Sequence, residues 1–235
     1  MARILAVGDV HGETALLRDV LTAARYTPGR DKLVLLGDYI DRGPDSLGTL
    51  NAVRELVALG AIALRGNHEQ LMVDVLACRA DMNEWLAKGG AAAIRSFAAS
   101  RPDGSWRSVA VEWADFLASL PLLHTDPPYV FAHAGIRPGP ARQSDEDLLN
   151  IRAGFLSRPG EPWPGRTVVF GHTKTRGIEG HGLDLPWLAP GRIGLNTGAG
   201  AGGPLTCMEL PCGRFWQARP GGRGRPPEDG IRRPG

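Results

Sequence analysis

Short runs of apolar and β-branched residues recur along this 235-residue chain, and turn-forming residues bound each run. Runs of this length and composition indicate β-strands. We expect strands at residues 4–7, 33–36, 61–64, 129–132, 168–170, 193–195 and 205–208. Between the first of these, residues 14–24 and 46–59 carry apolar side chains at helical spacing, and Ser46 is the expected N-cap. This alternation predicts an α/β fold with a mixed central sheet.

Residues 71–128 have a longer and mainly helical pattern that contains three tryptophans. We expect this segment to form a helical cover packed on the sheet, with the tryptophans in its core. It would belong to a single domain of residues 1–217, because no linker separates it from the rest. Residues 218–235 are rich in proline, glycine and arginine and have almost nothing to bury, so we expect them to be disordered.

The composition is that of an ordinary globular protein, with 43% hydrophobic and 22% charged residues. The chain has neither the apolar stretch of a secretory signal nor that of a membrane span, so we expect a cytoplasmic protein without a membrane partner. Five arginines give residues 218–235 a positive charge, whereas the rest of the chain is nearly neutral. Net charge therefore gives no support for a nucleic-acid partner.

Five polar clusters each follow directly on one of the expected strands. They read Gly-Asp-Val-His-Gly from Gly8, Gly-Asp-Tyr-Ile-Asp-Arg-Gly from Gly37, Arg-Gly-Asn-His-Glu from Arg65, His-Ala-Gly from His133 and Gly-His-Thr from Gly171. Ligands of open α/β sheets bind beyond the carboxyl ends of the strands. We therefore expect these five clusters to converge on one edge of the sheet.

The residue types in these clusters are those of a metal site. Asp9 and His11 are two residues apart, so an extended strand end points both side chains toward the same cation. Asp38 has two carboxylate oxygens and can bridge to a second cation. The second cation would then be held by neutral oxygen and nitrogen donors, which are Asn67, His133 and His172. Such mixed donors suit manganese, iron or zinc better than calcium.

Together the five motifs resemble the full signature of the calcineurin-like metallophosphoesterases. More narrowly, they resemble the phosphoprotein phosphatase branch with its small bacterial and phage-type serine/threonine phosphatases. The resemblance runs from Arg3 to about Glu209. It implies a four-layer α/β/β/α sandwich with two divalent metal ions, which we expect to be manganese, with iron or zinc as alternatives. It assigns one ion to Asp9, His11 and Asp38, and the other to Asp38, Asn67, His133 and His172.

The resemblance also implies a mechanism, in which a hydroxide that bridges the two ions attacks phosphorus in line. His68 would protonate the leaving oxygen, and Asp41 would orient its imidazole. The phosphate oxygens would be bound by three arginines, which are Arg42, Arg65 and Arg152. The assignment of Arg152 differs from the family pattern, because Asn150 stands where the family has tryptophan.

Two substrate classes fit these motifs. Phosphoserine and phosphothreonine proteins are the leading one, because Asp41 and Glu69 occupy motif positions as they do in protein phosphatases. The alternative is a dinucleoside polyphosphate such as diadenosine tetraphosphate, since the bacterial diadenosine tetraphosphatases resemble the same branch. Aromatic residues make up only 6% of the chain, and none follows the motifs where it could stack on a base. We therefore expect an open groove suited to phosphoprotein substrates.

Overall fold

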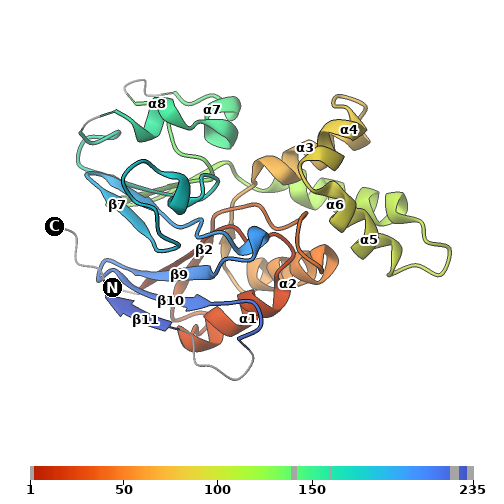
Figure 1. The fold of residues 1–235 in the computed structure, drawn as a ribbon, viewed down its shortest axis with the longest axis horizontal. Helices are drawn as coiled ribbons and strands as arrows, with labels where there is room; N and C mark the ends of the chain where they lie inside the picture. The colour runs from red at the N-terminus through yellow and green to blue at the C-terminus, as the bar shows by residue number, and fades with distance from the viewer. Residues whose placement is uncertain (1–2, 139–141, 159, 223–227, 232–235) are drawn as a thin grey trace.

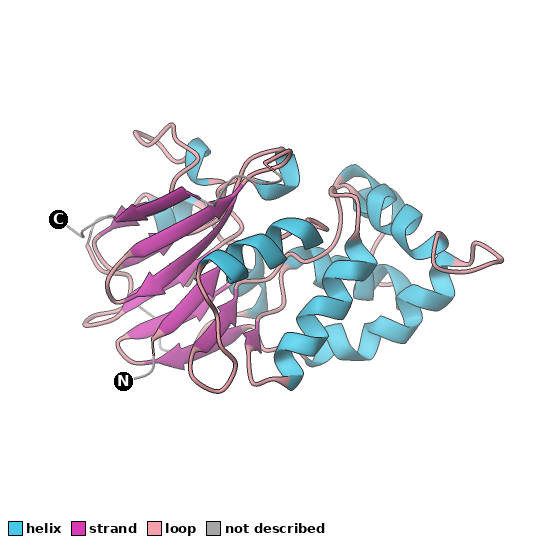
Figure 2. Cartoon of the chain, turned by 90° about the horizontal axis from the view of Figure 1, so that it is seen from below, coloured by secondary structure: helices cyan, strands magenta, loops and turns pink. Residues whose placement is uncertain are grey.

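The computed structural model describes residues 3–138, 142–158, 160–222 and 228–231. In this part of the chain the strands form two mixed sheets (Figures 1 and 2). The first sheet has the order β11-β10-β9-β1-β2-β3, that is Glu228–Ile231, Arg214–Ala218, Leu205–Leu210, Ile4–Val7, Lys32–Leu35 and Ile62–Ala63. The second has the order β4-β5-β6-β8-β7, that is Leu123–Asp126, Tyr129–Ala132, Thr167–Phe170, Arg192–Gly194 and Trp187–Ala189.

The seven expected strands all form, within one or two residues of their expected bounds. Strands β1, β2 and β3 run parallel, as do β5, β6 and β8, while β9 runs antiparallel to β1. The mixed α/β prediction is therefore confirmed. The strands that the sequence analysis does not predict are β4, β7, β10 and β11: β4, β7 and β11 lie at sheet edges, and β10 lies between β11 and β9.

Alternating side chains on the central strands divide the protein into layers. On β1, Leu5 and Val7 face helices α1 (Thr14–Ala23) and α2 (Ser46–Ala58), whereas Ile4 and Ala6 face the second sheet. The far side of the second sheet is covered by the short helices α7 (Asp145–Asn150) and α8 (Ala153–Leu156). Three apolar cores thus separate helices, sheet, sheet and helices, which confirms the four-layer sandwich.

The N-cap of helix α2 is the residue before the one we expected. The carboxylate of Asp45, and not Ser46, accepts the backbone N–H of Gly48 at 2.9 Å and caps the helix. Ser46 is fully buried, and its hydroxyl accepts the N–H of Asp41 at 3.1 Å. The side chain expected to cap the helix therefore supports the polar loop that follows β2.

Four helices form a group that stands to one side of both sheets (Figures 1 and 2). They are α3 (Asn67–Leu76), α4 (Met82–Ala87), α5 (Gly90–Ala98) and α6 (Trp106–Ser119). Their apolar faces pack on one another, and α5 packs on α2. The expected cover on a sheet face is thus corrected: the group extends the α2 layer. The end of the expected helical segment is not helical, because it forms strand β4.

The expectation of a disordered end is also corrected for part of the segment 218–235. Ala218 closes β10, and Glu228–Ile231 forms β11, which pairs antiparallel with β10. Backbone pairing with β10 thus adds one strand to the edge of the first sheet. Residues 223–227 and 232–235 lie outside the described part of the chain. No helix in the described ranges is both long and apolar enough to cross a membrane.

Candidate active site

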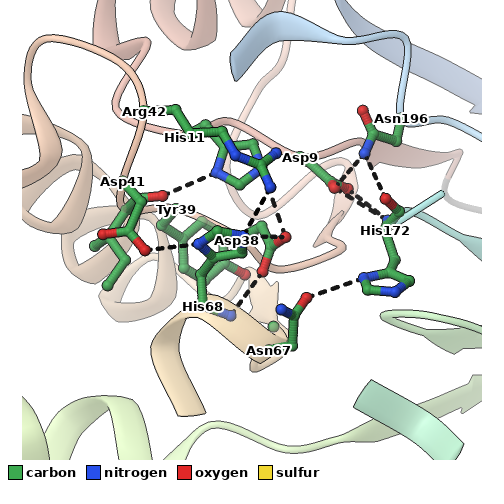
Figure 3. A network of polar contacts seen from close by, with 12 residues as sticks. Asp9, His11, Asp38, Tyr39, Asp41, Arg42, Asn67, His68, His172 and Asn196 are labelled. Atoms are coloured by element: carbon green, nitrogen blue, oxygen red, sulfur yellow. Dashed lines mark hydrogen bonds and ion pairs between the residues drawn. The ribbon is translucent and has the colours of Figure 1, made fainter. Parts of the chain in front are cut away.

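All five polar clusters lie at the carboxyl ends of strands, and the two packed sheets bring them to one place. Figure 3 labels residues from all of these clusters except the one at His133. From the first sheet, β1 is followed by Asp9 and His11, β2 by Asp38, and β3 by Asn67 at the start of α3. From the second sheet, β5 is followed by His133 and β6 by His172. The expected convergence therefore spans two sheets and not one.

Asp38 lies at the centre of this arrangement. Its carboxylate oxygens are 3.6 Å from Nε2 of His11 and 3.4 Å from Nε2 of His133. Two groups of three potential metal ligands share Asp38: one adds His11 and His68, and the other adds His133 and His172. In each group the ligand atoms lie within 4.8 Å of one another. One carboxylate shared by two groups of nitrogen donors suits a pair of cations.

The imidazoles are oriented as metal ligands are. Nδ1 of His11 donates to the carbonyl oxygen of Ile40 at 2.9 Å, and Nδ1 of His133 donates to that of Leu36 at 2.8 Å. Each of these rings therefore presents an unprotonated Nε2 to the site, because a backbone carbonyl fixes its tautomer. Nε2 of His172 is buried and has no hydrogen-bond partner among the described residues. These donors fit the metal ions that the motifs imply.

Burial controls the protonation of these groups. It is the largest cause that lowers the pKa of His11 to about 3 and of His172 to about 2, and it also lowers the pKa of His133. Burial alone would raise the pKa of Asp38, but attraction to the surrounding imidazoles, His133 first, outweighs it and holds that pKa below the usual range. Neutral imidazoles and an ionised carboxylate are the forms that bind metal.

Asp9 is placed differently from the expected ligand set. Its carboxylate oxygens both accept the backbone N–H of His172 at 3.0 Å, and one accepts from Nδ2 of Asn196 at 2.6 Å. Burial first, and then repulsion from Asp38, raise the pKa of Asp9 well above its usual value. Asp9 belongs to neither three-ligand group, and His68 takes its expected position beside His11.

Asn196 is a site residue that the sequence analysis missed. Besides Asp9, its Nδ2 also donates to the carbonyl oxygen of His172 at 2.9 Å, so it joins the ends of β1 and β6 (Figure 3). The available signal was its position, because Asn-Thr-Gly follows the strand at residues 193–195 as the five clusters follow theirs. The glycine-rich turn after it contacts the site: a Cβ at Gly200 would come 2.6 Å from Cβ of His11.

Glu69 has a structural role that the motif alone did not indicate. Its side chain is fully buried and accepts four backbone N–H groups, at distances between 2.7 and 3.2 Å, from Asp38, Tyr39, Ile40 and Gly66. Burial first, and then Asp38, raise its pKa to about 7. Glu69 thus ties the turn after β2 to the start of α3, and so fixes the backbone that carries Asp38.

His68 and Asp41 form a hydrogen-bonded pair beside the Asp38 carboxylate. Nδ1 of His68 donates to Oδ2 of Asp41 at 2.6 Å, and both side chains are almost fully buried. Burial lowers the pKa of His68, but attraction to Asp38 and the bond to Asp41 prevail and raise it. The indole N–H of Trp85 donates to both oxygens of Asp41 at 3.0 and 3.1 Å. Trp85 is in the core as expected, but it is also part of the site.

The three predicted phosphate-binding arginines are in different positions. Arg42 donates to Nε2 of His11 at 2.8 Å and lies 3.0 Å from Nε2 of His68. Arg152 lines the same pocket, but Arg65 does not: its guanidinium donates to the carbonyl oxygen of Ala118 at 3.0 Å, at the end of α6. The pocket has a volume of about 550 Å³ and is lined by Asp38, Arg42, Asn67, His68, Glu84, Lys88, Glu146, Asn150, Arg152 and His172.

Comparison with known proteins agrees with this geometry. The calcineurin-like phosphoesterase family matches residues 2–188. Serine/threonine-protein phosphatase 1 of Salmonella typhimurium is 33% identical, over 88% of this chain and 91% of that protein. The symmetrical bis(5'-nucleosyl)-tetraphosphatase of Nitrosospira multiformis is 37% identical, but over only 57% of this chain and 44% of that protein.

A solved structure gives the same fold over nearly the whole chain. The crystal structure of a candidate diadenosine tetraphosphatase covers 93% of this chain, and 93% of its own length is matched, with a TM-score of 0.67 and 27% sequence identity. The family match, the four-layer fold and the two ligand groups that share Asp38 lead to one assignment. This chain belongs to the calcineurin-like phosphoesterase family and is a dimetal phosphoesterase.

Proposed function

We propose that this phosphoesterase is a protein phosphatase that hydrolyses phosphoserine and phosphothreonine. The observation that carries the proposal is the shape of the site. The 550 Å³ pocket adjoins a second cavity of about 740 Å³, and both are lined by Arg42, Arg152 and His172. A polypeptide that extends beyond its phosphorylated residue needs such room. The match over 91% of a bacterial serine/threonine phosphatase supports the same substrate class.

We propose that Asp38 would be shared by two cations. The other ligands of these cations would be Asp9, His11, Asn67, His133 and His172. Oδ1 of Asn67 lies 3.0 Å from His133 and 2.9 Å from His172, so it belongs to the second ligand group. We expect manganese, with iron or zinc as alternatives, because the donors are mixed oxygen and nitrogen atoms. When bound, such ions make a water nucleophilic at neutral pH and polarise the phosphoryl oxygens.

The chain's own residues then bind the phosphate and supply the proton. Arg42 and Arg152 enter the pocket and can bind phosphate oxygens, whereas Arg65 must first leave the carbonyl of Ala118. Arg42 now lies 3.0 Å from Nε2 of His68, and its positive charge disfavours a proton on that nitrogen. A phosphate oxygen would attract Arg42 away from it. Substrate binding would thus release His68 to act as the general acid on the leaving oxygen.

Trp85 is a positioning residue in this scheme. Asp41 is fully buried, and its carboxylate accepts hydrogen bonds from His68 and Trp85. Its backbone N–H donates to the hydroxyl of Ser46. The indole N–H leaves the carboxylate few other orientations, so the imidazole of His68 is aimed at the site. Gly90 packs against the indole, because a Cβ there would come 2.8 Å from its ring atoms. The start of α5 therefore fixes Trp85, which in turn fixes Asp41.

Hydrolysis of dinucleoside polyphosphates is the second candidate function. The observation that favours it is the likeness, at a TM-score of 0.67, to the candidate diadenosine tetraphosphatase. The tetraphosphatase of Nitrosospira multiformis matches 57% of this chain, whereas the protein phosphatase of Salmonella typhimurium matches 88% of it. We therefore rank the protein phosphatase first.

Replacement of Asp38 by asparagine keeps the side-chain shape but removes the charge shared by both ligand groups. We expect the purified Asp38→Asn protein to lose at least one of the two metal ions under conditions in which the native protein holds both. Metal analysis of the purified proteins measures this. Asp115→Asn, on the exposed side of α6, is the matched control and should retain both ions. Two tightly held ions in Asp38→Asn would remove Asp38 from the bridge.

Replacement of His68 by asparagine tests the general acid. The variant should keep its metal but lose roughly 10²–10⁴ in kcat on alkyl phosphates, whose leaving oxygen needs a proton. Aryl phosphates with acidic phenols should lose much less. His68 also lies in one of the two ligand groups. Loss of metal together with an equal loss of rate on all substrates would therefore make His68 a ligand.

Replacement of Trp85 by phenylalanine removes one hydrogen-bond donor to Asp41 and keeps an aromatic ring in the core. Because the lost bond is to a carboxylate, we expect a fall of about tenfold in kcat on alkyl phosphates, with little change on activated aryl phosphates. Trp106→Phe is the matched control, since Trp106 packs beside Trp85 with ring centroids 5.8 Å apart. Equal losses in both variants, or equal losses on both kinds of substrate, would reduce Trp85 to a packing residue.

The substrate class is tested by comparing kcat/KM for phosphoserine or phosphothreonine peptides with that for diadenosine tetraphosphate in the same manganese buffer. We expect the peptides to be turned over faster, because the site extends into a second cavity. A preference of tenfold or more for the dinucleotide would overturn the protein phosphatase assignment. The dimetal phosphoesterase assignment would stand in either case.

A further inference from the structure

The cavity that adjoins the catalytic pocket has a chemical character of its own. We call it the Trp187 groove; it is lined by Arg42, Arg152, Ala153, Leu156, Ser157, His172, Thr173, Lys174, Gly177, Ile178, Glu179 and Trp187. Arg152 and His172 stand at the border with the catalytic pocket. A substrate whose phosphate lies in that pocket has the groove immediately beside it.

Three of the side chains that line the Trp187 groove are large and apolar. Leu156 comes from the end of α8, Ile178 follows the short helix η1 (Thr175–Gly177), and Trp187 begins β7. Trp187 and Leu156 are only partly buried. These three side chains come from separate segments and make up the apolar part of the lining, which we call the apolar wall. No local pattern in the sequence points to Trp187, because it lies 14 residues after Thr173, the end of the nearest motif, and reaches the groove through the pairing of β7 with β8.

The aromatic part of this wall is held in place before any ligand binds. The ring of Trp187 packs edge-on against Phe170, with centroids 6.1 Å apart and an interplanar angle of 77°. Phe170 packs in the same way against Phe155 at 5.0 Å, and both phenylalanines are fully buried. An ordered apolar wall can bind a partner without first losing the conformational freedom of its own side chains.

The charges around the groove favour a neutral occupant. Lys174 and Glu179 are exposed on its rim and carry opposite charges. Arg152 donates to the hydroxyl of Thr173 at 3.3 Å and faces the phosphate site. Apart from Arg42 and Arg152, which the groove shares with the catalytic pocket, the lining therefore lacks the excess of positive charge that the phosphate chain of a dinucleotide would require. A peptide with a large apolar side chain matches both the wall and the rim.

We propose that the Trp187 groove binds the apolar side chain of a residue next to the phosphorylated serine or threonine, and that Trp187 determines this preference. The inference rests on the proposed protein phosphatase function. It adds a sequence preference to it, namely for large apolar or aromatic neighbours.

The test compares phosphoserine peptides that differ only in having phenylalanine or alanine next to the phosphoserine, on either side. For the native protein we expect kcat/KM to be about tenfold higher with phenylalanine on one of the two sides, mainly through KM, because a phenylalanine side chain leaves water. In Trp187→Ala the ratio should fall to within twofold. Trp187→Leu, which keeps an apolar side chain against Phe170, should give an intermediate ratio. It replaces Trp187→Ala as the test if the alanine variant does not fold.

Trp163→Ala is the matched control. Trp163 and Trp187 both pack, partly buried, at the edge of the same core, but Trp163 does not line the groove. Its variant should keep the full preference. Equal rates on both peptides by the native protein, or an unchanged ratio in Trp187→Leu, would overturn the subsite while leaving the phosphatase function intact. Turnover of diadenosine tetraphosphate alone, with no peptide hydrolysis, would overturn the phosphatase function instead, and the subsite with it.

Discussion

The site depends on a carboxylate buried between two sheets. Asp38 is only 2% exposed, and an isolated charge at such depth is costly unless other groups compensate it. Here part of the compensation comes from His68, whose backbone N–H donates to Oδ1 at 3.1 Å and whose imidazole, with its raised pKa, lies 3.9 Å from Oδ2. The neutral imidazoles of His11, His133 and His172 add nitrogen donors around the same carboxylate. Cations held between these donors and Asp38 would supply the rest of the compensation.

The backbone around Asp38 is strained, and the surrounding structure holds it. Five site residues have left-handed φ values between 47° and 70°, namely His11, Asp38, Asp41, Arg42 and His172. Such conformations cost free energy for residues with side chains and persist only where neighbours over-determine them. Glu69 does this for the turn after β2 by accepting four N–H groups. Backbone bonds from Val10 and His11 to the carbonyl oxygen of Asp38 join this turn to the end of β1.

The group of helices α3–α6 completes the site from outside the sheets. Its first residue supplies Asn67, and α4 supplies the indole N–H that fixes Asp41. The second sheet contributes in a different way, because Trp187 on its outer strand gives the neighbouring groove an apolar wall. The second sheet thus carries two of the potential metal ligands, His133 and His172, as well as the wall of the neighbouring groove.

The central strands, the first two helices and the convergence of the polar clusters could be predicted from the sequence, because each is encoded locally. A β-branched run, a helical period and a polar residue just after a strand are readable over a few positions. The motifs likewise predict Asp38, His68 and Asp41 as site residues. Only the tertiary structure decided the contacts between distant segments: Asn196 on Asp9, Trp85 on Asp41, the turn of Arg65 toward α6, and Trp187 beside Arg152. These contacts depend on how the two sheets and the outer helices pack, and no local sequence pattern encodes that packing.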